Sequence, residues 1–329
     1  MYKVVIAGGA GFIGSELTRQ WVGRNAHVVV IDNLINGKRA NIQSLLGPQC
    51  QLLELDYRKI DEITPYLKNA DYVFHLACMG VRHSIHAPHE NHDVNATGAL
   101  RLLDAARTVG ARRFVYVSTS EVYGTARYAP MPEDHPTYPM TIYGASKLAG
   151  ECYTRAYHST YNYPTLVIRP FNSFGPRSHH EGDSGEVIPK FMLRGLANRP
   201  LIIFGDGLQT RDFTYVEDTA RGILELGIHK DSPGGTFNLG SSREITIQDL
   251  AATVKKVLGK PELQVKYESP RPGDVLRLCA DVSRAKSLCG FQARVPFKDG
   301  LEKLLIWIKS LGESPEQLLE LEKVRNWEA

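Results

Sequence analysis

A tyrosine and a lysine stand four residues apart in the segment Tyr143-Gly-Ala-Ser-Lys147. On a helix, residues at this spacing share a face, so the phenol and the ammonium group would face one site. A tyrosine with its ordinary pKa of about 10 is a poor base at neutral pH, but an adjacent cation favours the phenolate. Tyr143 would then take the proton of a substrate hydroxyl while hydride leaves the same carbon. The pair therefore indicates the oxidation of an alcohol.

Hydroxyl groups follow a predicted buried strand at residues 114–117. The strand runs directly into Ser118-Thr119-Ser120-Glu121. Ligand sites in open α/β sheets lie at the carboxyl ends of the strands, so Thr119 and Ser120 are expected to orient the reacting oxygen. Either segment alone is also typical of a surface helix or a polar turn. The two together favour a catalytic site, with Glu121 as an additional carboxylate.

A glycine-rich turn follows the first predicted strand, residues 4–7, and leads into a predicted helix at 16–22. Glycines permit a tight turn and close backbone approach, so a pyrophosphate can sit at the helix N-terminus. The strand before and the helix after make this a dinucleotide-binding turn rather than a set of isolated turn glycines. The cofactor is expected to contact Gly8, Gly11, Phe12, Ile13 and Gly14.

An acidic residue, Asp32, ends the second predicted strand. Its carboxylate would accept hydrogen bonds from the adenine-ribose hydroxyls and would repel a 2′-phosphate, which favours NAD over its phosphorylated form. Lys38 and Arg39 nearby work against that preference. Asn33 is assigned to the same site. Asp56, after the third strand, either contacts the adenine or is a solvated loop acid.

Strand-like runs recur along the first half of the chain, with segments of helical length between them. The runs are short and rich in β-branched residues, as in parallel strands buried on both faces. Strands that alternate with helices predict an α/β fold with a doubly wound parallel sheet of the Rossmann type, because parallel neighbours need crossover connections. The runs occupy residues 4–7, 28–31, 51–55, 72–76, 114–117 and 165–168.

The pattern changes near Gly175, where a stretch rich in Gly, His and charge is followed by shorter elements. We expect an NAD-binding domain over residues 1–171 and a smaller, mainly substrate-binding domain over residues 172–329. A strand near 234–242 would return to the first domain and interleave the two. His179-His180-Glu181 is interpreted, from its position alone, as part of a substrate lid.

The composition narrows the class of protein. The 329 residues carry 39 Lys and Arg against 36 Asp and Glu, a formal charge of +3, which disfavours a nucleic-acid partner. Five scattered cysteines predict free thiols and a cytoplasmic protein. No uncharged apolar run approaches the roughly 18 residues of a membrane span, so no membrane contact is expected.

A run of histidines raises the question of a metal site. Histidine recurs at every third position from 83 to 92. A step of three drifts around a helix of 3.6 residues per turn, and Pro88 interrupts the segment, so no metal is expected.

These motifs resemble the extended short-chain dehydrogenase/reductase family, and within it the nucleotide-sugar epimerases, dehydratases and decarboxylases. The resemblance covers about residues 1–310. Besides the glycine turn, the segment after residue 117 and the Tyr143/Lys147 pair, it is carried by Arg169-Pro-Phe-Asn-Ser-Phe-Gly-Pro-Arg177, Gly205-Asp-Gly207, Arg211-Asp-Phe213 and Arg271-Pro-Gly-Asp274.

The resemblance implies an NAD-dependent enzyme that acts on a nucleotide-diphosphate sugar, most often a UDP-sugar. It implies catalytic roles for Thr119, Tyr143 and Lys147, with Lys147 also contacting NAD. It also implies a homodimer paired through helices at 95–109 and 143–161. Guanidinium groups suit diphosphate oxygens. The nucleoside diphosphate would be bound by Asn172, Arg211, Arg271 and Asp274, while Arg82 and Arg177 would hold a uronate carboxylate or a phosphate.

The family's reactions share a first step, hydride removal from sugar C4, which leaves NADH and a 4-keto sugar. An epimerase returns the hydride to the other face. A 4,6-dehydratase needs a base at C5, and Glu121 resembles that of the GDP-mannose dehydratases and the glucuronate decarboxylases. Ser120, however, departs from the Asp-Glu pair of dTDP-glucose dehydratases. Residues 79–85 and 143–151 resemble UDP-glucuronate and UDP-glucose 4-epimerases.

We therefore favour a 4-epimerase that acts on a UDP-hexose or UDP-hexuronate through a 4-keto intermediate. The alternative is a nucleotide-sugar 4,6-dehydratase with Glu121 as the base at C5. A UDP-glucuronate decarboxylase is less favoured, because Pro139-Met-Thr-Ile142 replaces the Gly-Pro-Arg segment that is usual there. A non-catalytic NAD-binding sensor is the alternative from another class, since fold alone does not fix function.

Overall fold

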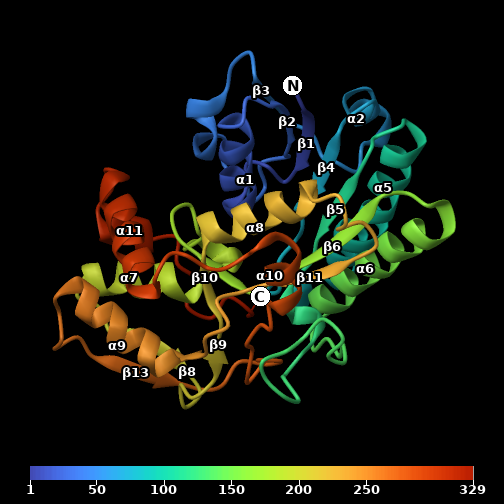
Figure 1. The fold of residues 1–329 in the computed structure, drawn as a ribbon. Coiled ribbons are helices and arrows are strands. Elements are labelled where there is room, and N and C mark those ends of the chain that lie inside the picture. The colour runs from blue at the N-terminus through green and yellow to red at the C-terminus, as the bar shows by residue number, and fades with distance from the viewer. Residues whose placement is uncertain (329) are drawn as a thin grey trace.

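A sheet of seven parallel strands forms the centre of the computed structural model, which describes residues 1–328 (Figure 1). The strand order is β11-β6-β5-β4-β1-β2-β3, so the winding direction reverses between β1 and β4. This confirms the predicted doubly wound α/β fold. The strands are β1 (Lys3–Ala7), β2 (His27–Ile31), β3 (Cys50–Leu53), β4 (Tyr72–His75), β5 (Phe114–Val117), β6 (Thr165–Pro170) and β11 (Thr236–Leu239).

Apolar side chains point alternately to the two faces of the sheet along each strand, so there are two cores, one on each face. In β1, Val4 and Ile6 belong to one buried cluster, whereas Val5 and Ala7 belong to the other, since successive side chains point to opposite faces. The first face is covered by α1 (Phe12–Val22), α8 (Val216–Ile228) and α10 (Ser283–Cys289). The second is covered by α2 (Ile60–Leu67), α5 (Ala99–Thr108) and α6 (Ile142–Tyr161).

The element boundaries differ slightly from the predicted ones. Helix α1 begins at Phe12 rather than at 16, because Gly11 is the extended N-cap residue and the helix starts directly behind the glycine turn. Strand β3 ends at Leu53 rather than 55. The shorter elements are α3 (His83–His86), α4 (Pro88–His92), the π-helix η3 (Asp93–Gly98), and the 3-10 turns η1 (Arg39–Asn41), η2 (Gln43–Leu45), η4 (Ser120–Val122) and η5 (Gly182–Ser184).

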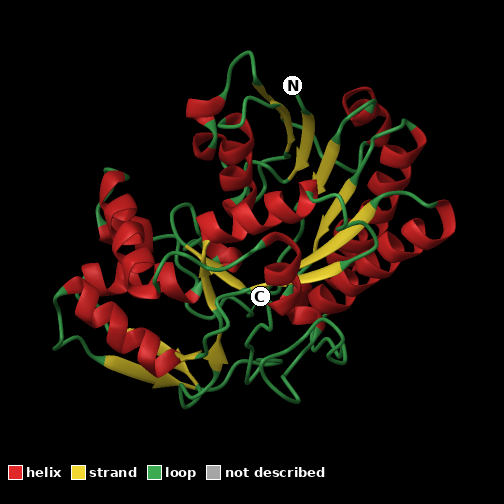
Figure 2. Cartoon of the chain, viewed as in Figure 1, coloured by secondary structure: helices red, strands yellow, loops and turns green. Residues whose placement is uncertain are grey.

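A second lobe lies below the sheet in the view of Figure 2 and has its own apolar core. It contains three two-stranded sheets: β7 (Asn172–Phe174) with β10 (Phe213–Tyr215), β8 (Leu201–Phe204) with β13 (Val265–Glu268), and β9 (Thr210–Arg211) with β12 (Ile245–Thr246). Its helices are α7 (Val187–Leu196), α9 (Ile247–Leu258), α11 (Phe297–Ser310) and α12 (Pro315–Leu319). The chain passes between the lobes repeatedly, because β11, α8 and α10 return to the sheet.

Membrane insertion has no support from the helices. Within residues 1–328, none of them combines the length and the apolar character that a bilayer crossing requires.

Candidate active site

A cavity of about 480 Å³ runs from the carboxyl end of the sheet into the second lobe. It opens beside the point where the strand order reverses, since residues that follow both β1 and β4 line it. Ligands of doubly wound sheets bind at this place. Every residue assigned from the sequence to catalysis, cofactor or substrate lines the cavity, with the single exception of Arg177.

Glycine is required in the turn at the cofactor end. Gly8 has φ +84°, and a Cβ there would lie 2.5 Å from the backbone nitrogen of Ala77. A Cβ on Gly14 would collide with the carbonyl oxygen of Gly8. The backbone of the turn is therefore bare, and the N-terminus of α1 is open to an anion. Gly11, Phe12 and Ile13 complete this wall, which fits the pyrophosphate of NAD.

Asp32 lies at the end of β2 with its carboxylate held by the backbone. Its Oδ2 accepts from the Ala10 N–H at 3.0 Å and its Oδ1 from the Leu34 N–H at 2.9 Å. Burial raises the pKa of Asp32, and these two hydrogen bonds act against that rise. Lys38 pairs with Glu181 at 2.6 Å, and Arg39 pairs with Glu54 at 2.5 Å. Both cations are therefore paired with other carboxylates and not with Asp32. The site remains suited to NAD rather than to its phosphorylated form.

Asn33 and Asp56 line the same end of the cavity. The Asn33 amide donates to Asp56 Oδ2 at 3.4 Å, and Arg58 Nη2 donates to the same oxygen at 2.7 Å. Hydrogen bonding from Arg58 lowers the pKa of Asp56. Asp56 is therefore an ion-paired acid at the cavity wall rather than a solvated loop acid.

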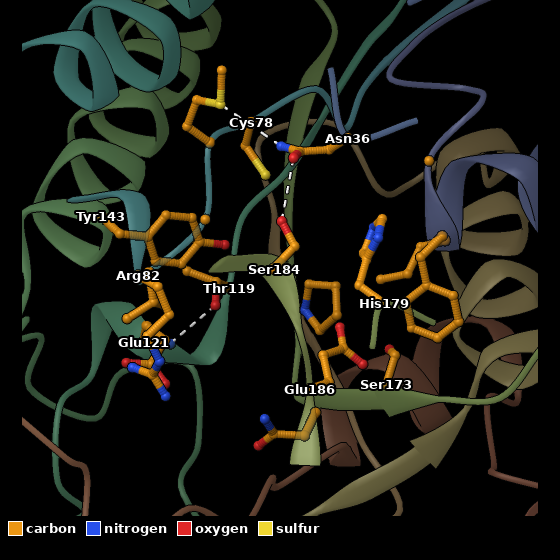
Figure 3. Close-up of a pocket in the computed structure, with 18 of the residues that line it drawn as sticks. Asn36, Cys78, Arg82, Thr119, Glu121, Tyr143, Ser173, His179, Ser184 and Glu186 are labelled. Carbon is orange, nitrogen blue, oxygen red and sulfur yellow. Dashed lines mark hydrogen bonds between the residues drawn. The ribbon is translucent and has the colours of Figure 1, made fainter. Parts of the chain in front are cut away.

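Helix α6 begins one residue before Tyr143, because the Thr141 hydroxyl caps it and accepts from the Gly144 N–H at 3.1 Å. A Cβ on Gly144 would lie 2.8 Å from the carbonyl oxygen of Glu121, so glycine lets the helix approach the η4 turn closely. Tyr143 is thereby brought beside Thr119. Figure 3 shows the Tyr143 hydroxyl pointing into the cavity, with Thr119 just below it.

Lys147, one helical turn further along α6, is 1% exposed. Its Nζ donates to the Val117 carbonyl oxygen at 2.7 Å and lies 4.4 Å from the centre of the Tyr116 ring. Burial lowers the pKa of the Lys147 ammonium group.

The pKa of Tyr143 differs from the sequence-based expectation. Desolvation inside the cavity raises it well above its ordinary value, and the nearby Cys78 and Glu121 raise it further, while hydrogen bonding to Thr119 lowers it. The cation of Lys147, which was expected to favour the phenolate, does not offset this rise. The ammonium group is bound to the end of β5, and desolvation of the phenol dominates.

Glu121 lies beside Arg82 at the wall of the cavity, as Figure 3 shows. Its backbone N–H donates to Thr119 Oγ1 at 3.2 Å, which fixes the η4 turn. Desolvation raises the pKa of Glu121, and Arg211 and Arg82 act in the opposite direction. Ser120, the residue between Thr119 and Glu121, is 3% exposed and also lines the cavity.

Arginines gather where the cavity enters the second lobe. Arg211 Nη2 pairs with Asp274 Oδ1 at 2.7 Å. The Arg271 guanidinium lies 4.6 Å from the centre of the Phe204 ring, and its Nε has no hydrogen-bond partner within residues 1–328. Burial, with repulsion from Arg82, lowers the pKa of Arg271 to about 9. Asn172 Oδ1 also lacks a partner among the described residues. This end is therefore suited to a polyanion.

Arg177 was expected at the substrate and is not there. Its Nη2 pairs with Glu16 Oε2 of α1 at 2.6 Å, and it does not line the cavity. Its backbone has φ +71°, which turns the chain before the loop of residues 178–186. The Glu16 side chain is 6% exposed, and its carboxylate holds the Arg177 guanidinium against α1.

Several cavity residues were missed from the sequence. Ser184 and Glu186 face Tyr143 across the cavity in Figure 3, together with His179 of the expected lid segment, and Cys78 lies near the Tyr143 ring. Desolvation raises the pKa of Glu186 to about 7, with His179 acting against that rise. No motif marks these positions, because they belong to a loop and a helix start whose placement depends on the second lobe.

The histidines at 83–92 do not converge. His83 Nε2 lies 3.3 Å from Glu90 Oε2, and His86 Nε2 lies 3.0 Å from Asp183 Oδ2. Within residues 1–328, no group of three or more His, Cys, Asp or Glu side chains is arranged to hold a metal ion.

Comparison with known proteins places the chain in a family. The model of the NAD dependent epimerase/dehydratase family matches residues 4–240, and the chain belongs to this family. It is thus an NAD-dependent enzyme of the nucleotide-sugar epimerase and dehydratase class, of the extended short-chain dehydrogenase/reductase type.

The curated relatives are named for different reactions. A putative UDP-glucose 4-epimerase of Methanocaldococcus jannaschii is 33% identical over 311 residues, which are 93% of this chain and 98% of the relative. UDP-glucuronic acid decarboxylase 1 of Arabidopsis thaliana is 32% identical over 310 residues, which are 92% of this chain and 69% of the relative.

Solved structures agree on the fold and also differ in reaction. The UDP-glucuronic acid 4-epimerase of Bacillus cereus, solved with UDP-glucuronic acid and NAD, has a TM-score of 0.87 and 33% identity, covering 94% of this chain and 99% of its own. The dTDP-glucose 4,6-dehydratase of Streptomyces venezuelae, solved with NAD, has a TM-score of 0.88 and 30% identity, covering 93% and 97%.

Proposed function

We propose that the protein is an NAD-dependent 4-epimerase of a UDP-sugar, working through a transient 4-keto intermediate. The observation that carries the proposal is the pair of hydroxyls of Tyr143 and Thr119 facing the cavity, with Ser120 rather than a second acid next to Glu121. Epimerisation needs a group that takes and returns a proton at the C4 oxygen, and room for the keto sugar to turn. Elimination of water needs a base at C5 and a separate acid for the leaving hydroxyl.

In the proposed reaction, NAD held by the glycine turn and Asp32 would supply the acceptor for the C4 hydride and its return to the opposite face. Tyr143 takes the proton of the C4 hydroxyl and later gives it back. Thr119 orients that oxygen, and Lys147 binds the ribose of the cofactor. Desolvation raises the pKa of Tyr143 in the protein alone. The positive charge of oxidised NAD would act against that rise and favour the phenolate that takes the proton.

The charges at the nucleotide end favour a neutral hexose over a hexuronate. Arg82, Arg211 and Arg271 are three guanidinium groups that face the two carboxylates of Glu121 and Asp274, so little positive charge is left beyond what a diphosphate requires. With Arg177 bound to Glu16, a uronate carboxylate would depend on Arg82, which already faces Glu121. UDP-glucose is therefore the first substrate to test.

The second candidate is a nucleotide-sugar 4,6-dehydratase. It is favoured by Glu121 itself, a carboxylate of raised pKa beside Thr119, which is suited to proton transfer at C5. Ser120 stands where this reaction needs a second acid.

The direct test is incubation with UDP-glucose, UDP-glucuronate and UDP-N-acetylglucosamine, with the products followed by NMR and mass spectrometry. We expect a C4 epimer of unchanged mass. Loss of water without a C4 epimer would support the dehydratase, and loss of carbon dioxide would support a decarboxylase. No NADH absorbance and no turnover with any of them would support a non-catalytic sensor. Sedimentation would test the predicted homodimer.

A further inference from the structure

Residues 321–327, called the latch below, follow α12 and run along the loop of residues 178–186, called the cover loop. The Gly182 N–H donates to the Leu321 carbonyl oxygen at 2.9 Å. Lys323 Nζ pairs with Asp183 Oδ1 at 3.1 Å. The Asn326 amide, 2% exposed, donates to the carbonyl oxygens of Asp183 at 3.1 Å and Gly185 at 3.2 Å. A buried amide thus holds two carbonyl groups of the cover loop.

The cover loop closes the cavity on the side opposite Tyr143. Asp183, Ser184, Gly185 and Glu186 all line the cavity. The loop is also tied to the cofactor side, because Ser184 Oγ donates to Asn36 Oδ1 at 3.2 Å and Lys38 pairs with Glu181 at 2.6 Å. The latch therefore supports the loop from outside while these contacts hold it from the cofactor side.

The last residue of the latch, Trp327, contacts the arginine cluster. Its ring meets the Phe204 ring edge to face, with centroids 4.7 Å apart. The Arg271 guanidinium lies 4.6 Å from the centre of the Phe204 ring and 5.5 Å from that of Trp327. Arg211 takes the carboxylate of Asp274, whereas Arg271 is held by aromatic faces. Because no carboxylate pairs with Arg271 within residues 1–328, its guanidinium is available to a ligand anion.

We propose that the latch prepares the site for the substrate diphosphate. Trp327 positions Arg271, and Asn326 positions the cover loop; both are positioning residues, since neither reaches the reacting carbon. The proposal rests on the proposed function only for the identity of the ligand, a nucleoside diphosphate. It holds whether the enzyme epimerises, dehydrates or decarboxylates the sugar.

The test compares nucleotide binding and loop protection in the full-length protein. UDP, dTDP and GDP are titrated by calorimetry into the wild type, and the one that binds most tightly is used as the probe. We expect Trp327→Leu to weaken binding about tenfold, within the range of a desolvated cation–π contact, and Trp327→Phe to restore most of it. The KM for the nucleotide sugar should rise with kcat unchanged. Arg325→Ala is the control, because Arg325 lies in the latch but pairs with Glu268 and Glu328 instead.

A double-mutant comparison separates positioning from a loss of stability. If Trp327 acts through Arg271, Trp327→Leu should have little further effect in an Arg271→Lys background. Additive losses, a Trp327→Leu variant that binds like the wild type, or an equal loss in Arg325→Ala would overturn the role of Trp327.

Hydrogen exchange tests Asn326 without any ligand. Asn326→Ala should raise exchange of the amides at 179–186 and leave the strands of the central sheet protected. Unchanged exchange in the cover loop, or a rise across the whole chain, would contradict the proposal. If the wild type binds none of the three nucleotides, the ligand assignment of the proposed function fails, and hydrogen exchange still decides the role of the latch.

Discussion

The two ends of the cavity are built in different ways. The glycine turn and Asp32 of the cofactor end come from one continuous stretch that begins with β1, and the turn presents backbone to the cavity; Asp56 after β3 adds a side chain. The substrate end is made of side chains from η4, α6, β7, β9 and the residues around 271, which only the fold brings together. Backbone sites tolerate few substitutions because their shape is the recognition element. Side-chain sites can change specificity through single residues.

Removing the Tyr143 hydroxyl should have the largest effect. Tyr143→Phe deletes the group that takes and returns the C4 proton, so kcat should fall by about 100- to 10,000-fold. Calorimetry with UDP should show nearly unchanged affinity, since the phenol does not lie among the arginines. A variant that keeps most of its kcat would mean that another group carries the proton.

Filling the glycine turn should break the cofactor end selectively. Gly14→Ala places a Cβ against the Gly8 carbonyl oxygen, and the backbone shift should lower NAD affinity by about 10- to 100-fold. Gly47→Ala is the matched control, because its Cβ would meet nothing within 4 Å. Fluorescence titration with NAD measures both. Equal affinity in the two variants would show that the turn does not touch the cofactor.

Two arginines that the sequence assigned to the substrate, Arg211 and Arg177, should differ in what their removal changes. If Arg211 binds the diphosphate as proposed, Arg211→Ala removes a charge-assisted contact and should raise KM about tenfold. Arg177→Ala removes the shortest ion pair of the buried Glu16, which keeps Arg19 at 3.6 Å, so it should lower the free energy of unfolding by about 1–3 kcal/mol and leave KM unchanged. Steady-state kinetics with urea unfolding would measure both. A raised KM in Arg177→Ala would return it to the substrate site.

The smallest effect should be a pH dependence from Glu186. Its pKa is raised to about 7, so it is neutral below that pH and gains a negative charge above it, inside the cavity proposed to bind a diphosphate. Nucleotide affinity should fall a few-fold between about pH 6 and 8. Neutral Glu186 also contributes to the free energy of unfolding at low pH, and this contribution is lost as pH rises through about 7. Calorimetry across this range should give a flatter profile for Glu186→Gln, and an identical profile would contradict the assignment.

Local patterns made much of this molecule predictable. The buried runs gave the sheet, and the glycine turn with Asp32 gave the cofactor end, because those features lie within a short stretch of chain. The placement of Arg177 was not predictable, since its partner Glu16 is 161 residues away in the chain. The pKa of Tyr143 was not predictable either, because the spacing to Lys147 says nothing about desolvation or about the carbonyl group of Val117 that holds the ammonium. Glu186 and the latch depend on how the second lobe packs.

The central claim is that hydride leaves and returns at C4 while C5 keeps its proton. The most direct measurement is the reaction of UDP-glucose in D₂O, with the product examined by NMR at each carbon. A 4-epimerase should give the C4 epimer with no deuterium at C5. Deuterium at C5, with loss of the C6 hydroxyl, would mean that Glu121 or another base removes that proton, and the account of the protein as an epimerase would be wrong.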